Sequence, residues 1–397
     1  MSAETAGRSV TLLLLFWLVG VGLRITVLAV PPVVPLLHAD LHLTEAGIGW
    51  LSSLPPMLFA IAAVPGALLI ARFGMVPALL TGLLLGAAGS AARGMFVSTA
   101  SLFVTTIAMG AGISIVQTVM PPLVRVWFPQ RIGLATSVYI NGLLLGEIIP
   151  VGLTIPFVLP LVHQSWRLDF VVWSVPVLAT ALLFVLCRPR RDAAGPPTVV
   201  PQRRWWPDWR DPLIWRLGLI LGSVNATYFV TNAFLPDLLA AGRRPDLVSS
   251  ALISINVGQL PGSLLMLPLA ERLVKRPWAY AATGLLSTSS VIAMLLTRGD
   301  WIVFWAGVLG FTGAVTLTMA LALPSILSPA DDVHRTTAGM FTISYSCAMV
   351  LSVVVGWLWD VTHRPLVGLA PIALGGLVIV ALASTVRQVD RNSAATV

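Results

Sequence analysis

The stretch LLLLFWLVGVGLRITVLAVPPVVPLL, residues 12–37, contains one charged side chain, Arg24, near its middle. An apolar run of this length can cross the roughly 30 Å hydrocarbon core of a bilayer as a helix. A guanidinium keeps its proton, and placing it at the bilayer centre costs roughly 2.5–3.5 kcal/mol on the most lenient scale. Arg24 is therefore expected to face protein or water, which makes it a candidate functional residue.

The rest of the chain is also strongly apolar. Of the 397 residues, 57% are hydrophobic and 10% are charged, whereas a soluble domain carries about 25% charged residues. A water-soluble protein is therefore excluded. Cys187 and Cys347 lie in or at the end of apolar runs without a nearby CxxC motif or His cluster, so neither a disulfide nor a metal site is predicted. No nucleotide-binding or nucleophile motif appears, and we expect no cofactor and no enzymatic activity.

Apolar runs separated by charged, Pro or Gly residues predict an all-α integral membrane protein with twelve transmembrane helices. The predicted spans are 11–36, 46–71, 76–96, 100–124, 132–160, 167–187, 212–238, 248–271, 277–297, 301–327, 336–358 and 365–386. With the N-terminus in the cytoplasm, most of the 24 Lys and Arg residues fall in cytoplasmic connections, as the positive-inside rule requires. We expect a multi-pass protein of the cytoplasmic (inner) membrane with both termini cytoplasmic. The net charge of +8 then needs no nucleic-acid partner.

The longest polar connection divides the chain into two halves. We predict an N-terminal six-helix bundle over 1–190, a cytoplasmic linker over 191–211 and a C-terminal six-helix bundle over 212–397. The first part of the linker is rich in Pro and Gly and is expected to be flexible. Four tryptophans interleaved with arginines predict an anchor at the lipid headgroups, with partner docking as the alternative; they are Trp205, Trp206, Trp209 and Trp215.

Short motifs recur in the two halves in the same order. The matched pairs are Pro65-Gly66 with Pro261-Gly262, Pro35 with Pro236, Arg131 and Gly152 with Arg335 and Gly356, and Pro121/Pro122 with Pro324. The register set by the two single prolines aligns Arg24 with Asn225. Two parallel-related six-helix halves with a site at their interface near the midplane are the layout of a rocker-switch secondary transporter.

The loop after the second predicted helix resembles that of the major facilitator superfamily. That superfamily carries G-x-L-a-D-R-x-G-R-[RK] there, and this chain has Gly66, Arg72 and Gly74 in the matching places but lacks the Asp and the trailing basic pair. The second copy, from Gly262 to Glu271-Arg272, keeps more charge. The resemblance implies the fold of that superfamily, in which helices 1, 4, 7 and 10 line the transport cavity.

Two further motifs resemble the cyanate/2-nitroimidazole permease branch of that superfamily. They are Gly22-Leu-Arg24, and Ile115-Val-Gln117-Thr-Val-Met120-Pro121 running into Arg125…Phe128-Pro-Gln130-Arg131. The spacing is similar over nearly the whole chain. The resemblance implies transport of small anions or small polar heterocycles.

Glu147 is predicted to be the only strongly buried charge besides Arg24. Both residues lie about half-way through their spans at 1.5 Å per residue, and the first and fifth helices are neighbours in the implied fold, so an ion pair is geometrically reasonable. Arg24 either binds an anionic substrate, which is the preferred interpretation, or holds helices together permanently. Glu147 either titrates as a proton-coupling carboxylate or serves as a static counter-ion.

Neutral polar residues complete the predicted substrate site. Asn225, Tyr228 and Asn232 fall on one face of the seventh helix, and Asn256 and Gln259 share a face of the eighth. Gln117 and Tyr345 are the remaining candidates. For Gln117, substrate binding and hydrogen bonding between helices are equal alternatives, and Tyr345 is a candidate wall residue.

These features predict a secondary transporter, working by alternating access as a monomer, for a small anionic or weakly acidic solute. Cyanate, a nitrate-like ion, a small carboxylate or a nitro-heterocycle all fit one arginine completed by amides and a tyrosine hydroxyl. Protons are a candidate second partner because Glu147 can titrate. The alternative is an efflux pump for drug-like or toxic compounds on the same fold, although the Gly-Pro-x-x-Gly-Gly ending typical of facilitator antiporters is missing. A membrane-embedded enzyme or a sensor is the least favoured class.

Overall fold

A computed structural model describes residues 3–43, 45–96, 98–187, 204–297, 299–362 and 365–387. These residues form helices and connections without any strand. The chain divides into two compact units, one of Met1–Leu123 with Val138–Trp206 and one of Val124–Ser137 with Pro207–Val397. The predicted flexible part of the linker, 191–203, lies outside the described residues, and the predicted domain boundaries remain a prediction.

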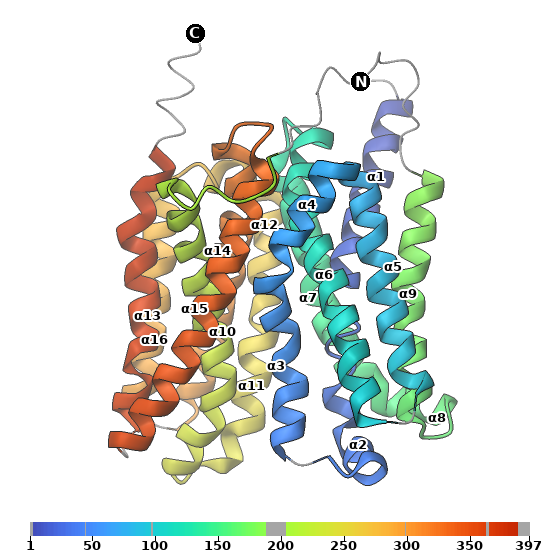
Figure 1. Cartoon of the computed structure of the whole chain (residues 1–397). Coiled ribbons are helices and arrows are strands. Elements are labelled where there is room, and N and C mark those ends of the chain that lie inside the picture. The colour runs from blue at the N-terminus through green and yellow to red at the C-terminus, as the bar shows by residue number, and fades with distance from the viewer. Residues whose placement is uncertain are drawn as a thin grey trace. The chain divides into compact units, whose positions relative to one another are not determined.

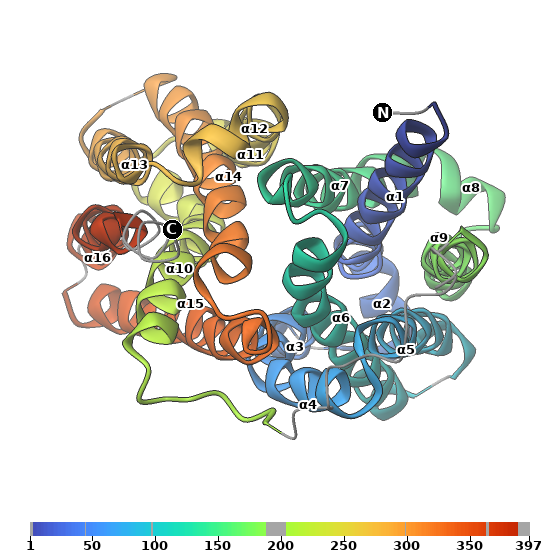
Figure 2. The ribbon, with the colours of Figure 1, turned by 90° about the horizontal axis from the view of Figure 1, so that it is seen from above.

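The first unit holds Arg24 and Glu147, and its helices run from blue to green in Figure 1. Its helices are α1 (Ala3–Gly22), α2 (Val34–Leu41), α3 (Glu45–Ile61), α4 (Ala63–Phe73), α5 (Met75–Met95), α6 (Thr99–Trp127), α7 (Ile132–Leu153), α8 (Leu159–Leu161) and α9 (Trp166–Cys187). The last turn of α6 and the first turns of α7 belong to the second unit. In the end-on view, α1 lies between α7 and α9 (Figure 2).

The second unit is built from longer helices around an apolar core. They are α10 (Pro212–Ala241), α11 (Val248–Val257), α12 (Gln259–Leu273), α13 (Pro277–Leu296), α14 (Trp301–Leu327), α15 (Val333–Thr362) and α16 (Pro365–Leu382). Helix α10 packs against α15 and α16, while α14 packs against α11, α12 and α13. Buried Val230, Leu235, Ile255 and Leu309 are among the residues of the core.

Each of the twelve predicted apolar segments contains helix in the described residues. Nine helices or helix runs are long and apolar enough to span a membrane, the bent pair α3 and α4 makes a tenth, and Ser9–Gly22 and Ala370–Val386 are shorter apolar helices. The predicted all-α membrane fold is thereby confirmed.

The first predicted span, 11–36, is not one continuous helix. Helix α1 ends at Gly22, residues 23–30 form turns, and a short 3-10 turn leads into α2. Pro31 and Pro32 account for the far end of this break, because they have no N–H for the carbonyls of Val27 and Leu28 and their rings crowd the preceding turn. Arg24 therefore lies in a break between α1 and α2 and not in mid-helix as predicted.

The repeated Pro-Gly motif breaks a helix in each unit. Pro65 follows the end of α3 at Ile61, and Pro261 follows the end of α11 at Val257. In both places the proline stands four residues after the last residue of the helix. Because proline has no backbone N–H, it cannot donate to the carbonyl of that residue. The glycine after each proline lies close to a neighbouring helix, Gly66 to Ile115 of α6 and Gly262 to Phe311 of α14. The internal repeat is thus visible in the backbone.

The four tryptophans in and just after the predicted linker form two separate contacting pairs. Trp205 and Trp206 stack edge to face with ring centroids 5.3 Å apart, and the indole N–H of Trp215 donates to the carbonyl of Trp209 at 2.9 Å. Trp206 and Trp215 have exposed rings. Exposed indoles suit the polar boundary of a bilayer, and the membrane-anchor role remains a prediction.

Candidate functional site

The guanidinium of Arg24 is paired with the carboxylate of Glu147. The Nε of Arg24 donates to Oε1 of Glu147 at 3.0 Å, and the two side chains keep 11% and 14% of their surface exposed. The guanidinium also lies over the ring of Phe59, 5.1 Å from its centroid, where a cation is attracted to the π face. The predicted pairing exists, and neither charge is sealed from the surroundings.

Three glycines bring α1 and α7 close enough for this pair to form. A Cβ added to Gly20 would lie 2.0 Å from the carbonyl oxygen of Tyr139, and one added to Gly142 would lie 2.1 Å from that of Trp17. A Cβ on Gly146 would lie 2.4 Å from the oxygen of Val21. Small residues allow such backbone contact between membrane helices. Trp17 also donates its indole N–H to Asn141 at 3.0 Å along the same contact.

Replacing Gly146 with alanine is expected to separate α1 from α7 and to weaken the Arg24–Glu147 pair. Overpacking of this kind costs about 1–3 kcal/mol, so the melting temperature should fall and solute affinity should fall with it. Thermal unfolding and concentration-dependent uptake measure the two effects. Gly152→Ala is the matched control, because nothing lies within 4 Å of a Cβ at that position. An unchanged Gly146→Ala protein would contradict the close contact.

Gln117 is the third predicted site residue in the first unit. It lies in α6 and is 5% exposed. The next residue, Thr118, donates its hydroxyl to the carbonyl of Ser114 in the same helix at 2.9 Å and faces Gly66 of α4. Binding of substrate by Gln117 remains a prediction.

The second unit joins three of its predicted site residues in one hydrogen-bond network. The hydroxyl of Tyr228 donates to Oδ1 of Asn256 at 2.7 Å, and Nδ2 of Asn256 donates to Oδ1 of Asn232 at 3.1 Å. Nδ2 of Asn232 in turn donates to the backbone carbonyl of Tyr228 at 2.9 Å. Helices α10 and α11 are thereby joined by half-buried polar side chains.

The other predicted residues of this unit lie outside that network of bonds. Asn225 donates instead to Oγ of Ser344 in α15 at 2.9 Å. Tyr345 is buried among aromatic rings, with centroids 6.1 Å from Phe341 and 6.4 Å from Phe229. Gln259 is buried at the start of α12, beyond the break at Gly258. Gly258 separates α11 from α12 between these two residues, and the helix face predicted to be shared by Asn256 and Gln259 remains a prediction.

Replacing Asn256 with alanine is expected to raise the KM for the solute about fivefold, because two half-buried side-chain bonds of about 0.5 kcal/mol each then no longer hold Tyr228 and Asn232. Concentration-dependent uptake measures this change. The control is Thr312→Ala, whose hydroxyl bonds only to a carbonyl of its own helix in the described contacts. Equal KM values in the two variants would exclude the network from solute binding.

The prediction that Arg24 and Glu147 are the only strongly buried charges is wrong. Arg93 is 1% exposed and Asp169 is fully buried. Arg93 is in the last turn of α5 and Asp169 in the first turn of α9. Both stand where charges normally flank a span. The sequence gives no sign that these two helix ends meet, as α5 and α9 do here.

The charged residues of the facilitator-type loops bond to helix ends within the second unit. Glu271 accepts the backbone N–H of Leu134 in the first turn of α7 at 2.9 Å, a favourable place for a carboxylate. Arg125 donates to the carbonyl of Ser325 at 2.9 Å and to that of Ser328, at the end of α14. In the first unit Arg72 lies over Phe73. In the second copy of the facilitator-type motif, the carboxylate of Glu271 thus stabilises the start of α7.

Comparison with known proteins agrees with this geometry. The chain is 26% identical over 365 residues to the 2-nitroimidazole transporter of Escherichia coli (strain K12), covering 89% of this chain and 90% of that protein. It is 26% identical over 324 residues to the cyanate transport protein CynX of the same organism, covering 80% and 82%. The resemblance to this branch is confirmed.

A solved structure has the same fold. The transporter FucP in its outward conformation superposes with a TM-score of 0.73 at 16% identity, covering 95% of this chain and 98% of that one. The family and the relatives named here are transporters and not enzymes. The family model described as Major Facilitator Superfamily matches residues 12–255. This chain belongs to the Major Facilitator Superfamily.

Proposed function

We propose that this membrane transporter is a secondary active transporter for a small anionic or weakly acidic solute, and that Arg24 binds the negative charge. The observation that carries the proposal is the position of Arg24 in the break of α1, paired with Glu147 and still partly exposed. Cyanate, a nitrate-like ion, a small carboxylate and a nitro-heterocycle are the solutes that fit.

A broken helix suits this role for a physical reason. Transporter sites near the bilayer midplane are typically formed where a helix is discontinuous, because unwound backbone and a nearby side chain can both face a ligand. An ionisable side chain at this depth is costly, and attraction to an anion is stronger there than in water. The names of the relatives support the solute class, since cyanate is a small anion and 2-nitroimidazole is a weakly acidic heterocycle.

We infer that transport is coupled to protons through Glu147. The carboxylate and an incoming anion compete for the same guanidinium. Protonation of Glu147 removes the competing charge, so it releases Arg24 to the solute, and loss of the proton returns the ion pair. This competition links the two binding events reciprocally, as linkage between sites requires.

We further propose that the protein acts as a monomer in the cytoplasmic (inner) membrane with both termini in the cytoplasm. The distribution of Lys and Arg supports this orientation. Labelling of single cysteines at the two ends, from each side of oriented membrane vesicles, would test it. Labelling of either terminus from the periplasmic side would reverse the assignment.

The solute class is tested by a thermal-shift screen followed by transport. Specific binding raises the melting temperature by mass action, so small anions should stabilise the purified protein and large organic cations should not. Proteoliposomes should then accumulate the stabilising anion when an inward proton gradient is applied. Stabilisation by drug-like cations alone, with proton-driven extrusion of them, would favour the efflux alternative.

A further inference from the structure

The break in α1 leaves a backbone carbonyl to be satisfied from outside the helix. In a continuous helix the N–H of Val30 would bond to the carbonyl of Thr26, but here it reaches Val27 at 3.4 Å. The carbonyl of Thr26 instead accepts a hydrogen bond from Nη2 of Arg93 at 2.7 Å. A side chain of α5 thus replaces a helical amide two residues beyond Arg24.

Arg93 is held tightly in this position. The same Nη2 atom donates to Oγ of Ser90 at 3.0 Å, and the guanidinium lies over the ring of Phe170 with its carbon 4.1 Å from the centroid. The next residue, Gly94, is so close to α9 that a Cβ there would lie 2.0 Å from the carbonyl oxygen of Arg167. The guanidinium therefore has a fixed direction toward the break.

Asp169 is the buried charge that offsets Arg93. Its carboxylate attracts the guanidinium electrostatically, and a buried ion without a counter-charge is strongly destabilising. The side-chain atoms Nε and Nη1 of Arg93, both carboxylate oxygens of Asp169 and Oγ1 of Thr26 are all buried without a protein hydrogen-bond partner among the described residues. Buried polar atoms of this kind can be satisfied by water, and electrostatic attraction is what links the charge of Asp169 to that of Arg93.

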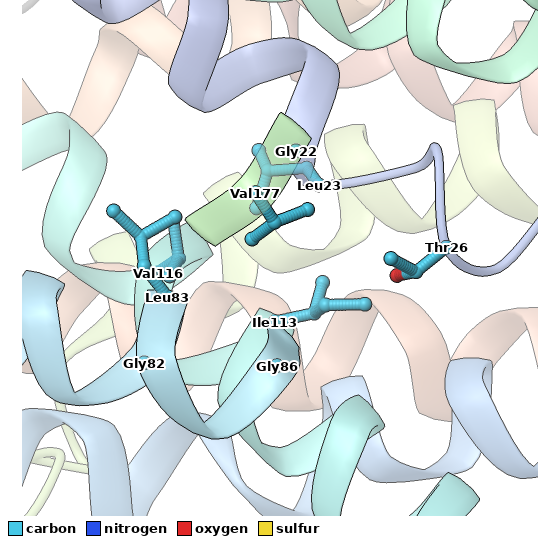
Figure 3. Close-up of a pocket in the computed structure, with 9 residues that line it drawn as sticks. All are labelled: Gly22, Leu23, Thr26, Gly82, Leu83, Gly86, Ile113, Val116 and Val177. Atoms are coloured by element: carbon cyan, nitrogen blue, oxygen red, sulfur yellow. The ribbon is translucent and has the colours of Figure 1, made fainter. Parts of the chain in front are cut away.

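A small cavity lies beside the segment that Arg93 holds. Leu23 and Thr26 from the break form one wall, and Gly82 and Gly86 of α5 lie opposite with Ile113 and Val177 from α6 and α9 (Figure 3). The turn that follows Arg24 is therefore not tightly packed against α5 on this side.

We propose that Arg93, with Asp169 as its counter-charge, is a positioning residue that fixes the break in α1 so that Arg24 meets Glu147 in a productive geometry. Arg93 itself does not touch the solute. The expected effect on solute affinity rests on the proposed role of Arg24. The expected effect on the backbone of residues 23–30 rests only on the bond from Arg93 to the carbonyl of Thr26.

The structural consequence is tested by hydrogen exchange on the full-length protein in detergent, without any solute. Arg93→Met should raise amide exchange in residues 23–30 at least about tenfold, while exchange in α10–α16 stays unchanged. The matched control is Arg167→Met, which removes an arginine from the same region that bonds to exposed Asp40 and does not reach the break. Unchanged exchange in residues 23–30 of Arg93→Met would overturn the proposal.

The transport consequence is tested with the same variants in proteoliposomes, with cyanate as the probe. Arg93→Met should raise the KM at least about tenfold with a smaller change in maximal rate, and Arg93→Lys should recover part of the affinity. If exchange rises but KM does not, Arg93 does not position Arg24 for transport. If Arg24→Ala also transports cyanate normally, Arg24 does not bind the solute. The hydrogen-exchange result then still tests whether Arg93 holds the backbone at Thr26.

A second variant keeps the test decisive if Arg93→Met unfolds. Arg93→Met with Asp169→Leu removes both buried charges, which should restore folding because no ion is left uncompensated. It should still show fast exchange at residues 23–30 and a raised KM, because the carbonyl of Thr26 remains without its donor. Normal exchange and a normal KM in this double variant would show that Arg93 only neutralises the charge of Asp169, and would overturn the positioning role.

Discussion

Arg24→Ala is expected to lower solute affinity at least about 30-fold, because truncating one partner of a buried, hydrogen-bonded charge pair costs 2–5 kcal/mol and 1.4 kcal/mol is a factor of ten. Uptake of cyanate at low concentration should therefore fall to background. Arg24→Lys should also transport poorly, since an ammonium lacks the planar fork of the guanidinium. Initial uptake rates over a range of concentrations, at equal protein incorporation, measure the effect.

Two further variants separate lost binding from lost stability. Arg24→Ala removes the positive charge that balances the carboxylate of Glu147 and should also lower the melting temperature. Arg24→Ala with Glu147→Gln removes both charges, so it should recover stability without recovering uptake. Arg244→Ala is the control, because Arg244 is an exposed arginine paired with Asp246, a kind of pair that contributes little to stability. Normal cyanate uptake by Arg24→Ala would refute the proposed anion site.

Glu147→Gln is expected to bind the anion about tenfold more tightly than the wild type and to lose proton-driven accumulation. A hydrogen bond to a charged group contributes about 1–1.5 kcal/mol more than a neutral one, so the neutral amide that replaces the carboxylate competes less for Arg24. In the wild type, anion affinity should rise as the pH falls, because protonation of Glu147 removes the competing charge. In Glu147→Gln, affinity should not change with pH, and solute exchange without a gradient should persist.

Glu147→Asp is the matched control for this experiment. It keeps a carboxyl that can bind a proton and should therefore retain pH-dependent binding, even if the shorter side chain weakens the pair. Wild-type uptake that ignores both external pH and a protonophore would show that Glu147 is a static counter-ion. In that case Glu147→Gln would change affinity alone, and the transport would be facilitated or coupled to another ion.

The twelve apolar segments were predictable because hydropathy belongs to each segment separately. The similar depth of Arg24 and Glu147 in the membrane was also predictable, because the rise per residue of a helix is constant. The break after α1 was not predicted, because the apolar run 11–36 was taken as one helix although it contains Pro31 and Pro32. The contact of Gly20, Gly142 and Gly146 needed knowledge of which helix faces meet.

The Arg93–Asp169 cluster shows where sequence reasoning fails. A charge within one turn of a helix end normally reaches the polar boundary, and neither residue differs from such a flank in the sequence alone. Their burial depends on the meeting of the end of α5 with the start of α9, and on Gly94 allowing the two backbones to touch. These are tertiary facts, determined by packing between segments about 75 residues apart along the chain.

The turns between α1 and α2 also constrain how the protein is assembled during synthesis. Lipid cannot hydrogen-bond to unwound backbone, so such a segment is stable at membrane depth only when protein encloses it. Its donor, Arg93, arrives with α5 and the counter-charge of that donor arrives with α9. The segment between α1 and α2 is therefore expected to reach its final conformation only after α9 has been inserted.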